Sequence, residues 1–231
     1  MLATEPENLI MLKAQFDDFG VELEIANGGS KRFKYLSLPR FQALMLKGYS
    51  VDSGILPPGT LAYKRTGKGD AISLFNPSCK QGLYYLDRNS KDKQDKKLTF
   101  NVPMPALVWF FRVDQDKHLS EARVFAVKDK LIRPTTMLYG YPFSNTFQDG
   151  KICFGSNDII GRKFPTLLSL AFVPRLFHFA PFNGEIDNNI PRTKQDESPT
   201  LSFFKEYNNK NTFPLEILKP HSTWQGVWNA I

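Results

Sequence analysis

The first 50 residues alternate between apolar and polar positions with the period of a β-strand. Val21–Ile25 and Lys31–Leu36 each show this alternation, which is typical of half-buried strands. A short helix is expected over Leu38–Leu46, because Ser37 can cap its first turn and Gly48 suits its end. The pattern therefore predicts an N-terminal extension of strands and one helix.

From residue 51 to about residue 155 the pattern predicts further strands. The shorter ones are Leu61–Tyr63, Ala71–Phe75 and Leu83–Leu86. The run from Pro103 to Phe111 is continuously apolar, as in a central strand that is covered on both faces. Ala122–Val127 is expected to return beside it. These segments predict antiparallel strands with one deeply buried member.

Beyond residue 155 the pattern becomes helical. The apolar positions of a first helix are Phe164, Leu167, Leu168 and Ala171. We expect Pro174 to interrupt this helix. Residues 183–199 are rich in polar residues and proline, which predicts an exposed loop. Ser198-Pro199 then opens a second helix that runs to about Tyr207.

The composition of the 231 residues excludes a disordered chain, because 42% of them are hydrophobic. No apolar run approaches the ~18 residues of a membrane span, and the first ten residues lack the features of a secretory signal. The two cysteines, Cys79 and Cys153, are too few for a disulfide framework and lack the paired spacing of a structural zinc site. A reduced, cytoplasmic location without membrane contact is therefore expected.

The formal net charge of +7 indicates an acidic partner, which the charge alone does not identify. Arg88–Lys97 holds five basic and two acidic residues, and we interpret it as a solvated hairpin tip. Nucleic acid is not its expected partner, because single-strand binders add aromatic stacking residues to a basic surface and this run contains none.

Tyr139–Ser156 is the segment in which chemistry is expected, since it fits neither a smooth helix nor a regular strand. Asp149-Gly150 is a tight-turn pair that brings Cys153 back towards Asn145, eight residues earlier. A thiolate is a good nucleophile and acyl carrier, and a neutral amide beside it stabilises the oxyanion that forms when an amine attacks a thioester. Asn145 and Cys153 therefore suit acyl transfer better than hydrolysis.

Two other interpretations of Cys153 stay open on the residues alone. A papain-type protease needs a histidine close to its cysteine. The three histidines all lie more than twenty residues from Cys153 along the chain: His118, His178 and His221. Folding can still bring one of them close. A lone cysteine between isoleucine and phenylalanine is also typical of a buried, unreactive residue. Cys79 is expected to have only a packing role.

The segment around Cys153 resembles the active-site loop of the ubiquitin-conjugating (E2) superfamily. E2 enzymes carry a His-Pro-Asn triplet whose asparagine lies eight residues before the catalytic cysteine, with a glycine three before it. Asn145 and Gly150 match both spacings. More closely, the chain resembles prokaryotic E2 family D, which includes a protein of the plasmid-type PRTRC system, over roughly residues 50–220. The motifs that carry this likeness are Leu56–Gly59, Leu61–Tyr63, Asn76-Pro77, Val102–Val108, Arg133-Pro134, Leu138-Tyr139, Pro142–Asn145 and Asp149–Gly155.

The resemblance implies an α+β fold, with an E2-like antiparallel β-meander flanked by helices and an N-terminal β extension. We expect one domain over residues 1–231, with residues 1–50 as the extension and residues 51–231 as the E2-like core and its C-terminal helices. The chain departs from the family pattern at Phe143 and Ser144, which stand where E2 enzymes have histidine and proline. The nearest carboxylates to the cysteine are Asp149 and Asp158, and neither is assigned a role.

By the same resemblance, Cys153 carries a ubiquitin-like protein as a thioester, and Asn145 steadies the oxyanion when an amine takes it over. Such proteins are encoded beside a ThiF-like activating enzyme, a ubiquitin-like protein and a JAB-type metallopeptidase. The chain itself is expected to need neither ATP nor a metal. Two alternatives remain. One is a catalytically idle E2-like scaffold that only binds partners, and the other is a basic DNA-associated accessory protein of a mobile element.

Overall fold

The chain forms two compact units, Met1–Asp52 and Ser53–Ile231. The structure is a computed structural model that describes residues 11–16, 20–27, 30–46, 53–87, 96–155, 157, 159–187 and 197–231. That the extension and the core make up a single E2-like domain stays a prediction.

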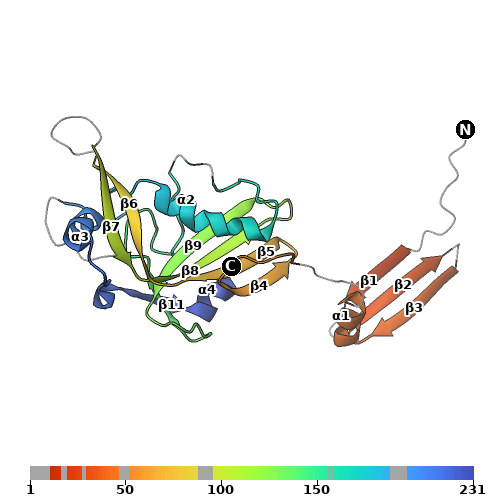
Figure 1. Cartoon of the computed structure of the whole chain (residues 1–231). Coiled ribbons are helices and arrows are strands. Elements are labelled where there is room, and N and C mark those ends of the chain that lie inside the picture. Colours follow the sequence, from red (N-terminus) through yellow and green to blue (C-terminus); the bar gives the residue numbers. More distant parts are fainter. Residues whose placement is uncertain are drawn as a thin grey trace, which may run out of the picture. The chain divides into compact units, whose positions relative to one another are not determined.

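The first unit contains a three-stranded antiparallel sheet and one helix (Figure 1). Its strands are β1 (Met11–Phe16), β2 (Val21–Asn27) and β3 (Ser30–Leu36), and helix α1 (Leu38–Leu46) follows them. The two predicted strands and the predicted helix are confirmed, and β1 is additional. Strand β3 lies at an edge of this sheet, since the strand order is β1-β2-β3.

The second unit is built on a six-stranded antiparallel sheet of order β11-β10-β9-β8-β5-β4. Its strands are β4 (Thr60–Thr66), β5 (Gly69–Asn76), β8 (Ala106–Val113), β9 (Leu119–Val127), β10 (Met137–Gly140) and β11 (Pro220–Thr223). Strands β6 (Cys79–Asp87) and β7 (Lys96–Met104) form a separate hairpin between β5 and β8. The predicted strands are thus confirmed, but the hairpin divides the expected meander. Most of the predicted hairpin tip, residues 88–95, lies outside the described residues.

The helical elements described in the second unit all follow β9, the last of its long strands. They are η1 (Leu167–Phe172), α2 (Val173–Phe179), α3 (Pro199–Tyr207), η2 (Leu215–Ile217) and α4 (Trp224–Ala230). The expectation that Pro174 interrupts the first helix is wrong. Pro174 lies in the first turn of α2, where a missing N–H needs no partner, so it begins an α-helix where the 3₁₀ helix ends.

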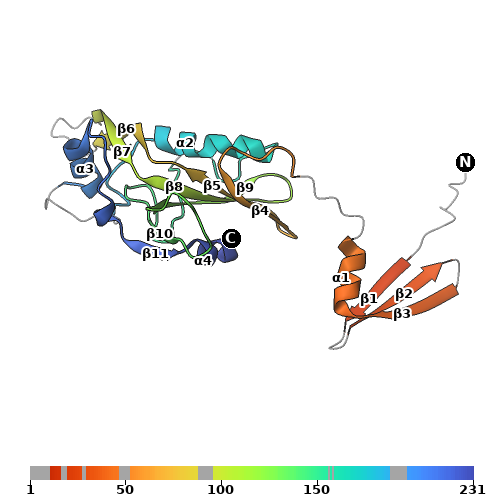
Figure 2. The ribbon, with the colours of Figure 1, turned by 60° about the horizontal axis from the view of Figure 1, so that its bottom comes forward.

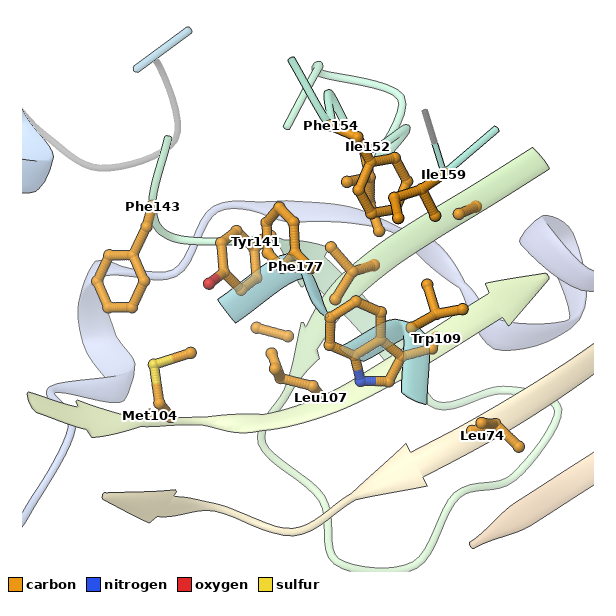
Figure 3. Packing of buried hydrophobic residues seen from close by; sticks show 14 of the residues in the cluster. Leu74, Met104, Leu107, Trp109, Tyr141, Phe143, Ile152, Phe154, Ile159 and Phe177 are labelled. Carbon is orange, nitrogen blue, oxygen red and sulfur yellow. The ribbon is translucent and has the colours of Figure 1, made fainter. Parts of the chain in front are cut away.

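Strand β8 separates two hydrophobic clusters, because its side chains alternate between the faces of the sheet. Trp109 packs against α2, where the ring of Phe177 lies 5.8 Å from its own (Figure 3). Phe110 faces the opposite side, and the rings of Trp224 and Trp228 from α4 lie 6.3 and 6.4 Å from it. Figure 2 shows α2 and α4 on opposite sides of the sheet. The prediction of a central strand covered on both faces is confirmed.

The observed architecture is a mixed α/β fold in which helices cover both faces of an antiparallel sheet. It agrees with the predicted α+β class, while the detailed E2 fold stays a prediction. Within the described part of the chain, no helix combines the length and the apolar character that a membrane crossing requires.

Candidate functional site

The segment Tyr141–Gly155, called here the Cys153 loop, leaves the main sheet after β10 and then returns to it. Strand β10 pairs with β9 at Phe125 and Ala126. The loop comes back to the same edge of β9, where Gly150 O accepts from Val124 N at 2.9 Å and Ile152 N donates to Ala122 O at 3.0 Å. The loop is therefore held at both ends by one strand.

A tight turn forms the outer part of the Cys153 loop. Thr146 and Ile152 form an antiparallel bridge, and Phe147 N donates to Lys151 O at 2.9 Å. Gly150 has a positive φ of 79°, and a β-carbon at this position would lie 2.2 Å from the Phe125 ring. Only glycine meets both conditions without strain. The predicted turn at Asp149-Gly150 is confirmed.

Asn145 and Cys153 face each other across the base of this turn. The Cys153 N–H donates to the Asn145 carbonyl oxygen at 2.9 Å. Asn145 adopts a left-handed conformation with a φ of 67°, which asparagine tolerates better than most residues. The structure therefore brings the two predicted site residues together through their backbones.

The side-chain amide of Asn145 is held by the segment that follows α2. Its Nδ2 donates to the carbonyl oxygen of Pro181 at 3.0 Å, and its backbone N donates to the carbonyl oxygen of Ile186 at 3.2 Å. An amide nitrogen carries two hydrogens, so the bond to Pro181 leaves one for another acceptor. The sequence carries no signal for these contacts, because both partners are backbone carbonyls.

The two cysteines differ in exposure. Cys153 is half-buried between the buried side chains of Ile152 and Phe154. Cys79 is exposed at the start of β6, in the wall of a surface hollow of about 410 Å³ that Met104 also lines. The cross-strand partner of Cys79 on β7 is the buried Met104, and burial raises the pKa of the Cys79 thiol, so the packing role expected for Cys79 stays a prediction.

Phe143 and Ser144, which replace the histidine and proline of the E2 triplet, are both fully buried. Phe143 packs into a group of aromatic rings with centroid distances from 5.0 to 6.4 Å: Tyr141, Phe182, Phe203, Phe204 and Phe213. Ser144 N donates to Thr200 Oγ1 at 2.9 Å, and that hydroxyl donates to Asp187 Oδ1 at 2.7 Å. Aromatic packing and the start of α3 thus fix the first half of the loop.

The segment around Asp187 corrects a second expectation. Residues 183–199 were expected to form an exposed loop, of which 188–196 lie outside the described residues. Gly184 and Glu185 are exposed as expected, but Ile186 and Asp187 are half-buried and hold Asn145 and Thr200. Thr200 is fully buried. The predicted helix start at Ser198 is confirmed, since its side chain accepts from Leu201 N.

Asp149, the described carboxylate that is nearest to Cys153 along the chain, pairs with Lys151. Burial by itself raises the pKa of Asp149, but hydrogen bonds from the backbone and side chain of Lys151 outweigh it, and the pKa lies below its usual range. Asp149 is therefore ionised and closes the turn. Asp158 lies outside the described residues.

The three histidines contact residues other than Cys153. His178 is buried beside Trp109, and burial lowers its pKa to about 4. His221 stacks on Phe125 with a centroid distance of 4.8 Å, and His118 Nδ1 lies 3.5 Å from Asp114. Among the described residues, none of the three donates to or accepts from Cys153. A hydrogen-bonded pair of histidine and cysteine, as in papain-type proteases, is therefore not seen in that part of the chain.

One group of side chains has the spacing of metal ligands. Asp114, Asp116 and His118 lie in the turn between β8 and β9, and one ligand atom of each lies within 4.8 Å of the others. Asp116 is exposed and the other two are half-buried, and exposed acidic groups are common without an ion. We assign them no role.

A surface hollow of about 460 Å³ lies beside the return of the Cys153 loop to the sheet. Arg123 and Glu121 from β9, Lys151 and Ile152 from the loop, and Ile160 contribute to its walls. Arg123 Nε donates to Glu121 Oε1 at 2.6 Å, which holds the Arg123 side chain in place. The hollow therefore reaches the residues that immediately precede Cys153.

Comparison with protein-family models identifies a family for this chain. The family model described as Prokaryotic E2 family D matches residues 40–221, which is most of the chain and includes the whole Cys153 loop. No curated protein and no solved structure matches the chain significantly.

Proposed function

This chain belongs to prokaryotic E2 family D, and from this premise we propose that it carries a ubiquitin-like protein as a thioester on Cys153 and passes it to an amine. A ThiF-like activating enzyme supplies the activated ubiquitin-like protein and uses the ATP. A JAB-type metallopeptidase encoded nearby acts on the same modifier. The chain described here supplies the cysteine and its surroundings.

The contact between Asn145 and Cys153 is the observation that supports this proposal most. The 2.9 Å hydrogen bond from Cys153 N to Asn145 O fixes the amide-bearing residue opposite the nucleophile. A half-buried sulfur is reachable yet partly shielded from water, which favours a thioester that must survive until an amine arrives. A fully buried cysteine would instead favour the idle scaffold.

Charging is a thioester exchange. The Cys153 thiolate attacks the carbonyl carbon of the thioester on the activating enzyme, a new S–C bond forms, and the thiolate of the activating enzyme leaves. The C-terminal tail of the ubiquitin-like protein has to lie extended next to Cys153. The hollow that Lys151 and Ile152 help to line is the surface next to the preceding residues of the loop, and we propose that part of the tail lies there.

Discharge transfers the acyl group to nitrogen. The amine attacks the thioester carbonyl, an N–C bond forms, and negative charge develops on the oxygen. The C–S bond then breaks, Cys153 leaves as thiolate, and the proton of the amine passes to water. The second N–H of the Asn145 amide stabilises the oxyanion, while the bond to Pro181 keeps the amide oriented.

The lost His-Pro pair is compatible with this mechanism. The buried ring of Phe143 and the bond from Ser144 N to Thr200 Oγ1 hold the loop from inside. These contacts replace the positioning that the histidine and proline give in E2 enzymes. The cysteine and the asparagine keep their places in the motif.

A charging assay tests the proposal. The full chain is mixed with the cognate activating enzyme, its ubiquitin-like protein and ATP, and the products are separated on a non-reducing gel. We expect an adduct that thiols remove, and Cys153→Ser should replace it with a thiol-resistant ester or abolish it. Cys79→Ser is the matched control, since Cys79 is the more exposed thiol, and it should charge like the wild type.

Discharge separates the role of Asn145 from that of Cys153. Asn145→Gly keeps the left-handed backbone and removes only the amide. Charging should persist, and single-turnover discharge to free lysine should slow about a hundredfold, because one oxyanion donor is lost. Equal discharge rates would remove Asn145 from the mechanism. An adduct on Cys153→Ala as strong as that on the wild type would refute the role of Cys153.

A further inference from the structure

Residues 181–187, called here the 181–187 segment, bind Asn145 at two points. Pro181 O accepts from the side-chain Nδ2 of Asn145 at 3.0 Å, and Ile186 O accepts from its backbone N at 3.2 Å. One end of the segment thus holds the amide and the other end holds the backbone. The orientation of the amide therefore depends on how firmly both ends are fixed.

The first end of the 181–187 segment is fixed by the β6–β7 hairpin. Phe182 N donates to Tyr84 O at 2.7 Å, and Leu86 N donates to Phe182 O at 2.8 Å. Phe182 is fully buried. These backbone bonds and this burial hold the residue next to Pro181 without the help of any charge.

The second end is fixed by a side chain. Asp187 is half-buried, and its carboxylate accepts from Thr200 Oγ1 at 2.7 Å, from Thr200 N at 3.0 Å and from the hydroxyl of Ser198. These donors lie at the start of α3, where N–H groups lack partners within the helix and negative charge is stabilised. Because Asp187 follows Ile186 directly, its carboxylate also fixes the carbonyl group to which Asn145 N donates.

The same carboxylate acts on the Cys153 loop by a second route. The Thr200 hydroxyl has one hydrogen, which it donates to Asp187, so its oxygen is left to accept from Ser144 N at 2.9 Å. Two consecutive backbone N–H groups of the loop thus depend on Asp187. Ser144 N depends on it through Thr200, and Asn145 N depends on it through Ile186.

The side chains that precede Asn145 offer the loop no polar support of this kind. Phe143 carries only a hydrocarbon ring, and Ser144 Oγ has no hydrogen-bond partner in the described part of the chain. Polar contacts that fix this part of the loop therefore come from the distant residues Asp187 and Thr200.

We propose that Asp187 is a positioning residue for the discharge of Cys153 and that it acts through the amide of Asn145. This inference rests on the proposed function. Asn145 has a left-handed backbone, which a residue other than glycine keeps where its surroundings impose it. With that backbone and the bond to Pro181 both fixed, the second Nδ2 hydrogen has one direction before the oxyanion forms. No bond or proton changes at Asp187.

Single-turnover discharge tests the proposal. The full chain is charged with the activating enzyme, its ubiquitin-like protein and ATP, and transfer to free lysine is then followed. Asp187→Asn keeps the size of the side chain but replaces one acceptor oxygen with a donor. Charging of Cys153 should be unchanged, and discharge should slow about tenfold, because the amide loses its fixed direction.

Glu197→Gln is the matched control. Glu197 also accepts hydrogen bonds from α3, from Ser202 Oγ at 2.6 Å and from Lys205 Nζ. Its substitution weakens contacts of the same helix but does not alter those that Thr200 makes. Discharge should therefore proceed as in the wild type.

A second pair of variants tests the route through the hydroxyl group. Thr200→Ser keeps the hydroxyl and should discharge like the wild type. Thr200→Val removes it at nearly constant volume and should slow discharge as Asp187→Asn does. Urea unfolding of each variant identifies those that are folded under the assay conditions.

A double-mutant cycle distinguishes positioning from a general weakening of the fold. In Asn145→Gly the amide is absent, so the addition of Asp187→Asn should slow discharge no further. A purely structural role would slow discharge by the same factor with and without the amide.

The proposal is overturned if Asp187→Asn and Thr200→Val both discharge like the wild type, or if Glu197→Gln slows discharge as much as they do. Equal slowing by Asp187→Asn in the presence and absence of the Asn145 amide also overturns it, as does loss of charging in folded Asp187→Asn. Each of these results leaves wild-type charging intact and the proposed function standing. Failure of the wild type to charge on Cys153 would instead refute the proposed function, and this inference with it.

Discussion

The two halves of the Cys153 loop are built in opposite ways. The inner half, Tyr141–Thr146, is buried except for Asn145 and is anchored by aromatic rings and by Thr200 at the start of α3. The outer half, Phe147–Gly155, alternates between exposed and buried residues and is held mainly by backbone bonds to β9 and to itself.

This difference indicates how the loop can keep its geometry without a His-Pro pair. The inner half acts as a fixed base that the core determines. The outer half carries Cys153 and brings it back beside Asn145. Asn145 is the one half-buried residue of the inner half. Positioning and reactivity are thus separated between the halves, and substitutions in each should have different consequences.

Truncation of the buried phenylalanine should have the largest effect. Phe143→Ala removes a fully buried ring from the aromatic group and should lower the free energy of unfolding by about 4 kcal/mol. Phe147→Ala, in the outer half and 48% exposed, should change it by less than about 0.5 kcal/mol. Urea unfolding followed by tryptophan fluorescence measures both. Equal losses would show that the two halves are not built differently.

Acid should destabilise the inner half of the loop through His178. The ring of His178 stacks on that of Tyr141 with a centroid distance of 6.4 Å. Burial lowers the pKa of His178 from 6.5 to about 4 in the folded protein. As the pH falls from 6.5 to 4, the unfolded imidazole takes up a proton that the folded one does not. The free energy of unfolding should therefore fall by about 3 kcal/mol over this range from this group alone.

His178→Phe provides the comparison for this pH effect. Phenylalanine fits the surrounding rings and does not titrate, so the variant should lose that part of the decline between pH 6.5 and 4. Unfolding curves at a series of pH values measure the difference. The same decline in both proteins would mean that His178 does not sense acid in the folded state.

Alanine substitutions at two glycines of the outer half allow the cost of steric crowding to be measured separately from the cost of backbone strain. Gly150 and Gly155 both have positive φ values, of 79° and 59°. A β-carbon at Gly150 would overlap the Phe125 ring, whereas nothing lies within 4 Å of one at Gly155. Gly150→Ala should cost about 3 kcal/mol and Gly155→Ala about 1 kcal/mol. Thermal unfolding compares them, and equal costs would contradict the packing of the turn on β9.

A small effect on stability is expected at Asn145, near the junction of the halves. Asn145→Gly loses the hydrogen bond to Pro181 but keeps the backbone conformation, and should cost about 1 kcal/mol. A cost as large as that of Phe143→Ala would make Asn145 a structural anchor instead of a positioned amide. The unfolding free energy of this variant also shows whether its discharge rate can be interpreted.

The sequence predicted the local part of this site and missed the distant part. The turn at Asp149-Gly150 and the eight-residue spacing foretold that Asn145 and Cys153 would meet, because both follow from backbone geometry over a few residues. The carbonyl of Pro181 and the hydroxyl of Thr200 come from segments more than thirty residues away. No periodicity encodes such contacts.

Exposure was predicted less well than secondary structure. The strands around the buried β8 followed from their apolar patterns. The alternation of Lys31–Leu36 predicted a half-buried strand, but six of the seven residues of β3 are exposed, and this strand lies at an edge of its sheet. Apolar residues indicate where a strand forms, but the tertiary arrangement decides which of its side chains are covered.

The most direct test of the account is to locate the acyl group by mass spectrometry. The Cys153→Ser protein is incubated with the activating enzyme, the ubiquitin-like protein and ATP, and then digested with a protease. The wild type is analysed alongside without reducing agent. We predict a thioester on Cys153 in the wild type, and any ester of the Cys153→Ser protein should join the C-terminal residue of the ubiquitin-like protein to residue 153. The unmodified peptide should be found for Cys79. Attachment at Cys79, or no attachment to either wild-type cysteine under conditions in which the activating enzyme itself is charged, would contradict it.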